Sequence, residues 1–173
     1  MKFLERAANL ATLVGVAVFL VLVFRGELEK RRVPNISPNA FVGKTVRLPG
    51  VSFPQPRASL VLALSTSCHF CKESLPFYKD LAEQATGRVN VVALLPQSQA
   101  EAESYVHEAG VKATQVVSSS LDSIGVNATP TVLLLDGTGK VQGAWVGSLD
   151  EKARKNLLAM VFAKVNKLGA TGP

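Results

Sequence analysis

Cys68 and Cys71 are the only cysteines of this 173-residue chain, and they are separated by His69 and Phe70. They follow the apolar run 60–64 and open a helical pattern, so we expect them at a strand-to-helix turn. Free backbone N–H groups and the positive end of the helix dipole stabilise an anion there, so a thiol loses its proton more easily. The thiolate can attack a disulfide, and a second cysteine one turn later can resolve the mixed disulfide. The pair therefore predicts thiol–disulfide exchange.

Other roles for the two cysteines fit the sequence less well. A zinc site needs two further ligands, and the only histidines are His69 and His107. A haem-attachment motif needs a histidine directly after Cys71, where Lys72 stands. A structural disulfide across so few residues would close too small a loop to restrict the unfolded chain. Two buried and inert thiols are the remaining alternative, although such a turn is an exposed place to keep them.

The elements that must position the cysteines begin with strands. Three runs are apolar throughout, as expected of strands with helices on both sides of the sheet: residues 60–64, 91–95 and 132–135. Residues 113–117 predict a further strand, and the turn residues 136–139 predict a hairpin between 131–135 and 140–146. Alternating polar and apolar residues around Pro49-Gly50 predict another β-hairpin over 43–53, at the amino-terminal end of the domain.

Helical patterns lie between these strands and after the last of them. One face of residues 71–85 is apolar, as in a helix that packs against a sheet. Ser98 with Glu101, and Ser148 with Glu151, match the capping box that starts a helix. Strands and helices alternate first, and a hairpin with a helix closes the domain. The pattern predicts an α/β fold with a mixed β-sheet flanked by helices.

The amino-terminal region predicts a membrane anchor. Residues 7–24 carry no charge, and as a helix they would span roughly 27 Å, just enough for the hydrocarbon core of a bilayer. A cleaved signal peptide is the main alternative, but no small-x-small cleavage site follows the run. We expect an anchor over 1–24, a linker over 25–42, a soluble domain over 43–168 and a loose tail over 169–173. Basic residues flank both ends of the apolar run, so charge does not decide its orientation.

The overall composition indicates a folded domain that does not bind nucleic acid. Hydrophobic residues make up 47% of the chain and charged residues 18%, which argues against disorder. The net charge is +6, but six of the 19 lysines and arginines lie within residues 1–33. No basic run with interleaved aromatic residues follows, so we expect no nucleic-acid partner.

Two motifs make the sequence resemble thioredoxin-fold proteins. The first is Ser-x-x-Cys-x-x-Cys-Lys-x-x-x-Pro, which ends at Pro76, and the second is Asn-Ala-Thr-Pro-Thr-Val-Leu over 127–133. The stretch between Val91 and Pro130 is long enough for an extra helix and strand, as in membrane-anchored redoxins similar to TlpA and MauD. The resemblance covers residues 43–168 and implies a thioredoxin fold with this helix–strand insert.

The resemblance implies a role for each site residue. Cys68 would be the exposed nucleophile, and Cys71 would be the buried resolving thiol. Pro130 would be a cis-proline that faces the disulfide, and Thr129 before it would present backbone groups to an extended substrate. No cofactor would be needed, because the cysteine pair itself carries the electrons.

The sequence departs from the resembled family at three places. Leu62 stands where thioredoxin has a buried acid, six residues before the first cysteine, and Ser67 replaces the usual tryptophan before the nucleophile. His69 follows Cys68, and in its protonated form it would stabilise the thiolate and make the disulfide more oxidising. A solvent-exposed His69 with a modest effect is the equal alternative. His69 and Phe70 are also our candidates for contact with the substrate.

We expect an extracytoplasmic, periplasmic-side thiol–disulfide oxidoreductase that acts on cysteine pairs of another protein. Reduction is the expected direction, because the resembled subgroup is largely reducing, and Leu62 and His69 leave oxidation open. The anchor would hold it near a membrane electron donor, and the lack of other cysteines suits an oxidising compartment. The alternative is a membrane-tethered metallochaperone that holds Cu(I) on Cys68 and Cys71, since copper(I) prefers thiolates. Peroxide reduction is weaker, because the peroxidatic motif needs threonine and proline where Ser65 and Val61 stand.

Overall fold

The computed structural model of the protein describes residues 15–21 and 37–169. Contacts divide the chain into two units, Met1–Asn35 and Ile36–Pro173. Residues 15–21 are helical. None of the helices in the described ranges has the length and apolar character needed to cross a membrane. Most of the predicted anchor, most of the predicted linker and nearly all of the predicted tail lie outside these ranges.

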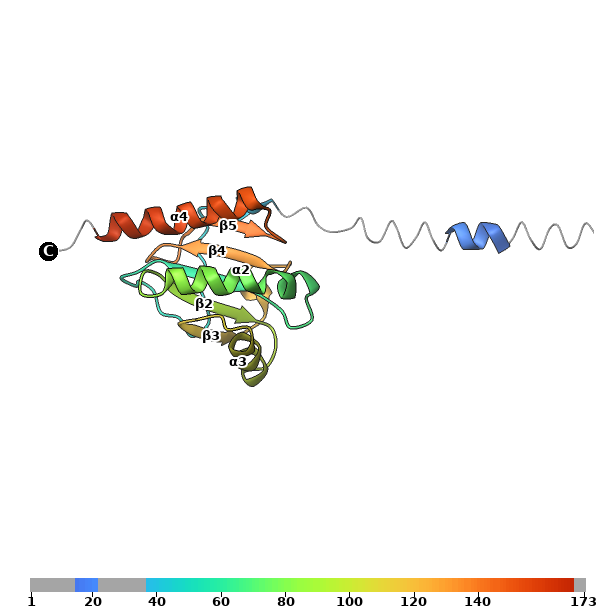
Figure 1. Cartoon of the computed structure of the whole chain (residues 1–173), viewed down its shortest axis with the longest axis horizontal. Coiled ribbons are helices and arrows are strands. Elements are labelled where there is room, and N and C mark those ends of the chain that lie inside the picture. Colours follow the sequence, from blue (N-terminus) through green and yellow to red (C-terminus); the bar gives the residue numbers. More distant parts are fainter. Residues whose placement is uncertain (1–14, 22–36, 170–173) are drawn as a thin grey trace, which may run out of the picture. The chain divides into compact units, whose positions relative to one another are not determined.

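The second unit is built on one mixed five-stranded sheet (Figure 1). Its strands are β1 (Ser59–Ala63), β2 (Asn90–Leu95), β3 (Gln115–Ser118), β4 (Thr131–Leu135) and β5 (Val141–Val146). In space their order is β3-β2-β1-β4-β5. The strands β1, β2 and β3 run parallel, whereas β4 is antiparallel to both β1 and β5. The predicted mixed sheet and its terminal hairpin are confirmed, and so is the predicted additional strand, which lies two residues later than expected.

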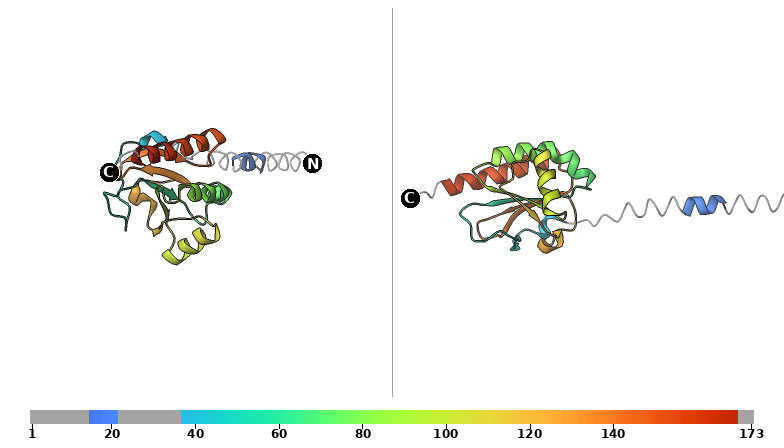
Figure 2. Two further views of the ribbon diagram at one scale, coloured as in Figure 1. Left: turned by 60° about the vertical axis from the view of Figure 1, so that its left-hand side comes forward. Right: turned by 90° about the horizontal axis from the view of Figure 1, so that it is seen from below.

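Three α-helices pack on one face of this sheet, α2 (His69–Ala85), α3 (Gln99–Glu108) and α4 (Glu151–Gly169). Figure 2 shows α2 and α4 side by side over that face. They bury the apolar side chains of alternate strand positions, among them Leu60, Leu62, Leu64, Val132 and Leu134. The insert predicted between β2 and β4 is present as α3 and β3. Because α2 follows β1 after a short loop, the start of α2 lies at the end of the sheet where β1 finishes.

The opposite face of the sheet is covered differently from our prediction of helices on both sides. Its side chains pack against an irregular segment and the 3-10 helix η2 (Leu121–Ile124), with core contacts from Phe41, Val46, Leu48, Ile124 and Val126. Within the described residues, no α-helix contributes to this second core cluster. An apolar strand therefore indicates that both faces of the sheet are buried, but it does not indicate what covers each face. An irregular segment with enough apolar side chains covers a face as well as a helix does.

The predicted hairpin over 43–53 is wrong. The backbone N–H of Gly43 donates to the carbonyl of Val141 at 2.8 Å, and the N–H of Val46 donates to the carbonyl of Gly139 at 2.9 Å. The first half of the segment thus pairs with the β4–β5 hairpin, and no strand forms over 51–53. Alternation of polar and apolar residues correctly indicated an extended chain, but alternation does not specify the pairing partner.

The boundaries of two predicted segments also shift. The 3-10 helix η1 (Pro38–Ala40) and the buried side chain of Phe41 pack on the domain, so the end of the predicted linker belongs to the folded unit. Ser98 caps α3 as predicted and accepts from the N–H of Glu101. At α4 the cap is Asp150 rather than Ser148, because the Asp150 carboxylate accepts from the N–H of Ala153 at 2.7 Å.

Candidate redox site

Cys68 occupies the amino-terminal cap of α2, directly after the loop that follows β1. Its backbone is extended while the next residue begins the helix, which is the usual conformation of a capping residue. Its sulfur accepts a hydrogen bond from the N–H of Cys71 at 3.2 Å. The Cys68 side chain is partly exposed, whereas Cys71 is 0% exposed. The predicted placement at a strand-to-helix turn is confirmed, and so is the burial of the second thiol.

The loop before β4 brings Thr129 and Pro130 against Cys68. The Sγ of Cys68 lies 3.3 Å from the carbonyl oxygen of Thr129 and donates to it. The Thr129–Pro130 peptide bond is cis, as the resemblance implied. The N–H of Gly147 donates to the carbonyl of Pro130 at 2.8 Å, and the hydroxyl of Thr131 donates to the carbonyl of Ala128 at 2.8 Å. These bonds hold the loop across the sheet edge from the cysteine pair, 61 residues from Cys68 in sequence.

Burial controls the second thiol. Loss of solvent raises the pKa of Cys71 from its ordinary 9.0 to about 12, and the neighbouring Cys68 sulfur adds to the rise. The backbone of Ser65 and the side chain of Thr129 oppose the rise by hydrogen bonding to the Cys71 sulfur. Cys71 therefore keeps its proton near neutral pH, and Cys68 is the thiol placed to attack a substrate.

We expect Cys71 to titrate far above an ordinary cysteine. In a Cys68→Ser chain labelled with carbon-13 at Cβ of cysteine, the NMR shift of Cys71 should change only well above pH 9, because burial is retained. The folded chain binds the Cys71 proton more tightly than the unfolded chain does. The contribution of this proton to the free energy of unfolding is therefore complete below about pH 9, and it is lost as the pH rises toward 12. The urea-unfolded chain is the control and should titrate near 9. A native midpoint near 9 would contradict the burial of this thiol.

His69 and Phe70 lie on the exposed start of α2. The Phe70 side chain is 55% exposed, and its ring meets the His69 ring edge-on with centroids 5.6 Å apart. The Nε2 of His69 lies 3.0 Å from a carboxylate oxygen of Glu73, one turn along the helix. Such an exposed pair contributes at most about 0.5 kcal/mol. An exposed apolar ring two residues after Cys68 in the sequence is suited to contact a substrate, and that role stays a prediction.

Sequence reasoning missed the polar network that holds the loop before the cysteines. The Thr66 hydroxyl donates to a carboxylate oxygen of Glu101 at 2.9 Å, and the Gln97 amide donates to the Ser65 hydroxyl at 3.1 Å. Glu101 lies on α3 and Gln97 just precedes it, so the inserted helix is tied to the active-site loop. The run Ser65-Thr66-Ser67 signalled donors in this loop, but it did not indicate which groups accept from them.

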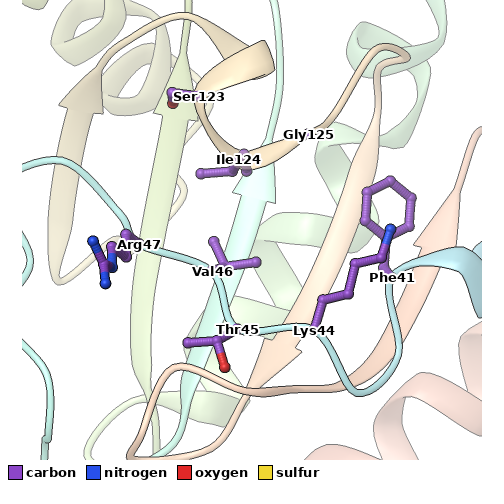
Figure 3. Close-up of a pocket in the computed structure, with 8 residues that line it drawn as sticks. All are labelled: Phe41, Lys44, Thr45, Val46, Arg47, Ser123, Ile124 and Gly125. Carbon is purple, nitrogen blue, oxygen red and sulfur yellow. The ribbon is translucent and has the colours of Figure 1, made fainter.

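Two of the hollows on the surface of the described domain differ in their position relative to the predicted site. One has a volume of about 380 Å³ and adjoins the cysteine loop, with the lining residues Thr66, Lys72, Glu101, Ser104, Tyr105 and Glu108. The other, about 140 Å³, lies between the 41–47 segment and η2 and contains none of the predicted site residues (Figure 3). Figure 3 shows Lys44 and Arg47 on either side of Val46, with their side chains pointing apart. We therefore place the candidate site at the cysteines and not in this second hollow.

Comparison with known proteins supports the fold. No protein-family model matches the sequence, and no curated protein matches it. Among solved structures, a DsbF homologue from Corynebacterium diphtheriae aligns with a TM-score of 0.53 at 14% identity, over 64% of this chain and 73% of that one. A secreted thiol-disulfide isomerase from Corynebacterium glutamicum gives 0.52 at 16%, over 65% and 72%. A thiol:disulfide interchange protein from Bacteroides sp. gives 0.54 at 17%, over 72% and 90%.

These likenesses and the topology assign the second unit the thioredoxin fold. The structures that it resembles are thiol:disulfide interchange proteins and isomerases. The fold places the start of α2 and the loop of Pro130 at one edge of the sheet, and the two cysteines of this chain lie there.

Proposed function

We propose that this protein is a thiol–disulfide oxidoreductase that acts on cysteine pairs of another protein. The observation that carries the proposal is the position of the Cys68 sulfur. It caps α2, accepts the N–H of Cys71 at 3.2 Å and faces the carbonyl of Thr129 at 3.3 Å. A sulfur held at a helix start next to a second thiol is placed for thiol–disulfide exchange, and no other cofactor is needed.

The reaction follows from the different surroundings of the two sulfurs. The partly exposed Cys68 attacks one sulfur of a substrate disulfide as a thiolate, and the other substrate sulfur leaves as a thiolate. Cys71 then loses its proton and attacks Cys68, which releases the second substrate sulfur and leaves a Cys68–Cys71 disulfide. Two electrons pass from the protein to the substrate. The exposed Phe70 ring and the backbone before Pro130 are the surfaces that we assign to substrate contact.

We propose the reducing direction. A strongly oxidising pair needs positive charge that stabilises the reduced thiolate. The Nε2 of His69, the residue after Cys68, lies 3.0 Å from a carboxylate oxygen of Glu73. The negative charge of Glu73 therefore weakens any effect of a positive charge at His69 on the Cys68 sulfur. The resemblance to membrane-anchored TlpA-like redoxins, which are largely reducing, supports the same direction.

The direction is tested by the reduction potential of the full-length chain in thiol–disulfide buffers and by its reduction of insulin. We expect insulin reduction and a potential well below the roughly −120 mV of strong oxidants. No insulin reduction, together with failure of the two cysteines to form a disulfide, would overturn the proposed function. Stoichiometric Cu(I) binding by the reduced chain without reductase activity would favour the metallochaperone instead. Within the described residues, no group of three or more His, Cys, Asp or Glu side chains is placed to hold a metal ion.

We further propose that an anchor within residues 1–24 holds the domain on the extracytoplasmic side, where a membrane protein supplies electrons. The uncharged run 7–24 and the absence of cysteines other than the pair support this location. One of the structures of similar fold is that of a secreted isomerase.

A membrane-impermeant maleimide tests the location. It is expected to label Cys68 in intact cells that express the full-length chain, because the domain would face outward. A Cys68→Ser chain is the control for labelling of the buried thiol. Labelling of Cys68 only after the cells are lysed would place the domain in the cytoplasm.

A further inference from the structure

Two buried phenol hydroxyls lie in the core around Cys71. The chain has only two tyrosines, Tyr78 on α2 and Tyr105 on α3. Among the described residues, neither hydroxyl has a hydrogen-bond partner, although both oxygen atoms are shielded from solvent. A buried hydroxyl without a partner destabilises a protein, so its presence calls for a physical reason.

Tyr78 lies on the same face of α2 as Cys71. Cys71, Ser74 and Tyr78 are spaced by three and four residues and are all buried, with Cys71 and Tyr78 both 0% exposed. Long side chains in a helix point back toward its amino terminus. The Ser74 hydroxyl is close enough to lower the pKa of Tyr78, though outside hydrogen-bonding geometry. The phenol therefore reaches back to the level of Ser74, about one turn from the Cys71 sulfur.

Tyr105 approaches from the inserted helix. Its side chain packs against the core cluster that contains Cys71 and lines the hollow that adjoins Thr66 and Lys72. The pKa of Tyr105 is raised to about 12, mainly by burial, and negative charge on Cys71 contributes to the rise. For Tyr78, burial is again the largest cause of the raised pKa, the Ser74 hydroxyl opposes it, and negative charge on Cys71 is the largest of the charge effects.

The other charged group with an electrostatic effect on these phenols comes from α4. Positive charge on Arg154 lowers the pKa of Tyr78, and its guanidinium stacks on the Phe77 ring at 5.0 Å. Negative charge on Cys68 affects both tyrosines less than that on Cys71. No carboxylate appears among these groups, and Leu62 occupies the place where the resembled family has an acid. Since both phenols hold their protons at neutral pH, they can stabilise an anion but cannot remove a proton.

We propose that the hydroxyl of Tyr78, assisted by that of Tyr105, stabilises the negative charge that the Cys71 sulfur carries when it resolves the mixed disulfide. This inference rests on the proposed function and deepens it. Hydroxyl dipoles fixed in an apolar, water-excluded region act strongly on a nearby charge. The two tyrosines are thus positioning residues, which act through the charge on Cys71. Their unpartnered hydroxyls destabilise the fold of the dithiol form, and we infer that the chain keeps them because they are needed in this step.

The step balances without a further reactant. Cys71 releases its proton, which the departing substrate thiolate takes up. The Cys71 thiolate forms a bond to the Cys68 sulfur while the bond between Cys68 and the substrate sulfur breaks. The substrate gains two electrons in the whole reaction, and the two cysteines lose two. The tyrosines keep their protons throughout.

The test follows the two chemical steps separately. The reduced full-length chain, in buffered solution, reacts with the disulfide 5,5′-dithiobis(2-nitrobenzoate) as the probe. Attack by Cys68 releases one coloured thiolate in a first phase, and resolution by Cys71 releases the second in a second phase. Tyr78→Phe is expected to leave the first phase unchanged and to slow the second roughly threefold. We expect the variant to lower the fraction of Cys71 present as thiolate about tenfold. The net slowing is smaller, because a more basic sulfur is also a better nucleophile. Tyr78→Phe with Tyr105→Phe should slow it by roughly tenfold.

Two further measurements exclude a merely structural effect. Tyr78→Phe should unfold at the same or a higher temperature, because a buried hydroxyl without a partner has been removed. The pH at which the second phase reaches half its maximal rate should rise in the variant. Thr86→Val is the matched control, since it removes a hydroxyl at the far end of α2 and should leave both phases unchanged.

The outcomes are distinct. An unchanged second phase in the double variant overturns the inference while leaving the proposed function intact. Equal slowing of both phases, or a lower unfolding temperature with an unshifted pH profile, also overturns it, because the tyrosines would then only support the local fold. A wild-type chain that shows no second phase refutes the proposed function itself, and the inference fails with it.

Discussion

A Cys71→Ser chain should attack its substrate and then stop at the covalent stage. Turnover of a protein disulfide is expected to fall by a factor on the order of 10³, because residues that act as one unit lose nearly the whole effect together. A mixed disulfide through Cys68 should accumulate, since a serine hydroxyl cannot displace the bound sulfur. The reason is that Cys71 is the only other cysteine of the chain, and its backbone nitrogen lies 3.2 Å from the Cys68 sulfur.

The matched variant is Cys68→Ser, which should fail at the earlier step. This variant retains only the Cys71 thiol, which is buried and keeps its proton near neutral pH. We therefore expect neither turnover nor a trapped complex. Trapping is followed on non-reducing gels, and mass spectrometry of the complex formed in cells identifies the physiological partner. If Cys68→Ser retains full insulin reduction, or if Cys71→Ser turns over like the wild type, the assignment of nucleophile and resolving thiol is wrong.

Leu62→Asp should be among the most destabilising substitutions in the domain. Leu62 is 0% exposed on the central strand β1, where its neighbours in register are the buried residues Ala93 and Val132. A carboxylate there has no water and no partner, so burial would raise its pKa far above the usual 3.9. At neutral pH this should cost on the order of 4 kcal/mol beyond the loss of leucine packing.

The sign of the pH dependence follows from the raised pKa. A folded-state pKa above the unfolded value means that the folded chain tolerates the protonated acid, so the penalty is absent at low pH and grows as pH rises above about 4. Leu62→Asn is the control, because it removes the same packing without adding a titratable group. Urea unfolding should show the two variants alike at pH 4 and Leu62→Asp less stable by roughly 4 kcal/mol at pH 7.5. An equal gap at both pH values would show that water reaches this position.

The Leu62 prediction bears on how this chain differs from the family that it resembles. In that family an acid near the second cysteine takes up its proton, and here the corresponding core is apolar. The backbone of Ser65 and the side chain of Thr129 act on the Cys71 sulfur, and negative charge on Cys71 in turn acts on the phenols of Tyr78 and Tyr105. Hydroxyls remain neutral when buried and so avoid the penalty that a carboxylate would incur.

The sequence by itself determined the features that depend on neighbours along the chain. The apolar runs predicted the central strands, Ser98 marked the start of α3, and the spacing of Cys68 and Cys71 predicted a sulfur at the start of a helix. Strand burial, capping and helix phase each act over a few residues, so a local pattern carries them. The proposed thiol–disulfide chemistry rests on this local arrangement.

Only the tertiary structure decided what meets these elements across space. The extended segment that includes Val46 pairs with the β4–β5 hairpin and not with its own continuation, and irregular chain covers the face where helices were predicted. The hydroxyls of Tyr78 and Tyr105 gain their significance only from the packing of α2 and α3 into the core cluster that contains Cys71. Alternation and apolar character state that a residue is buried, but many partners bury it equally well. The choice among them is made by the packing of the whole chain.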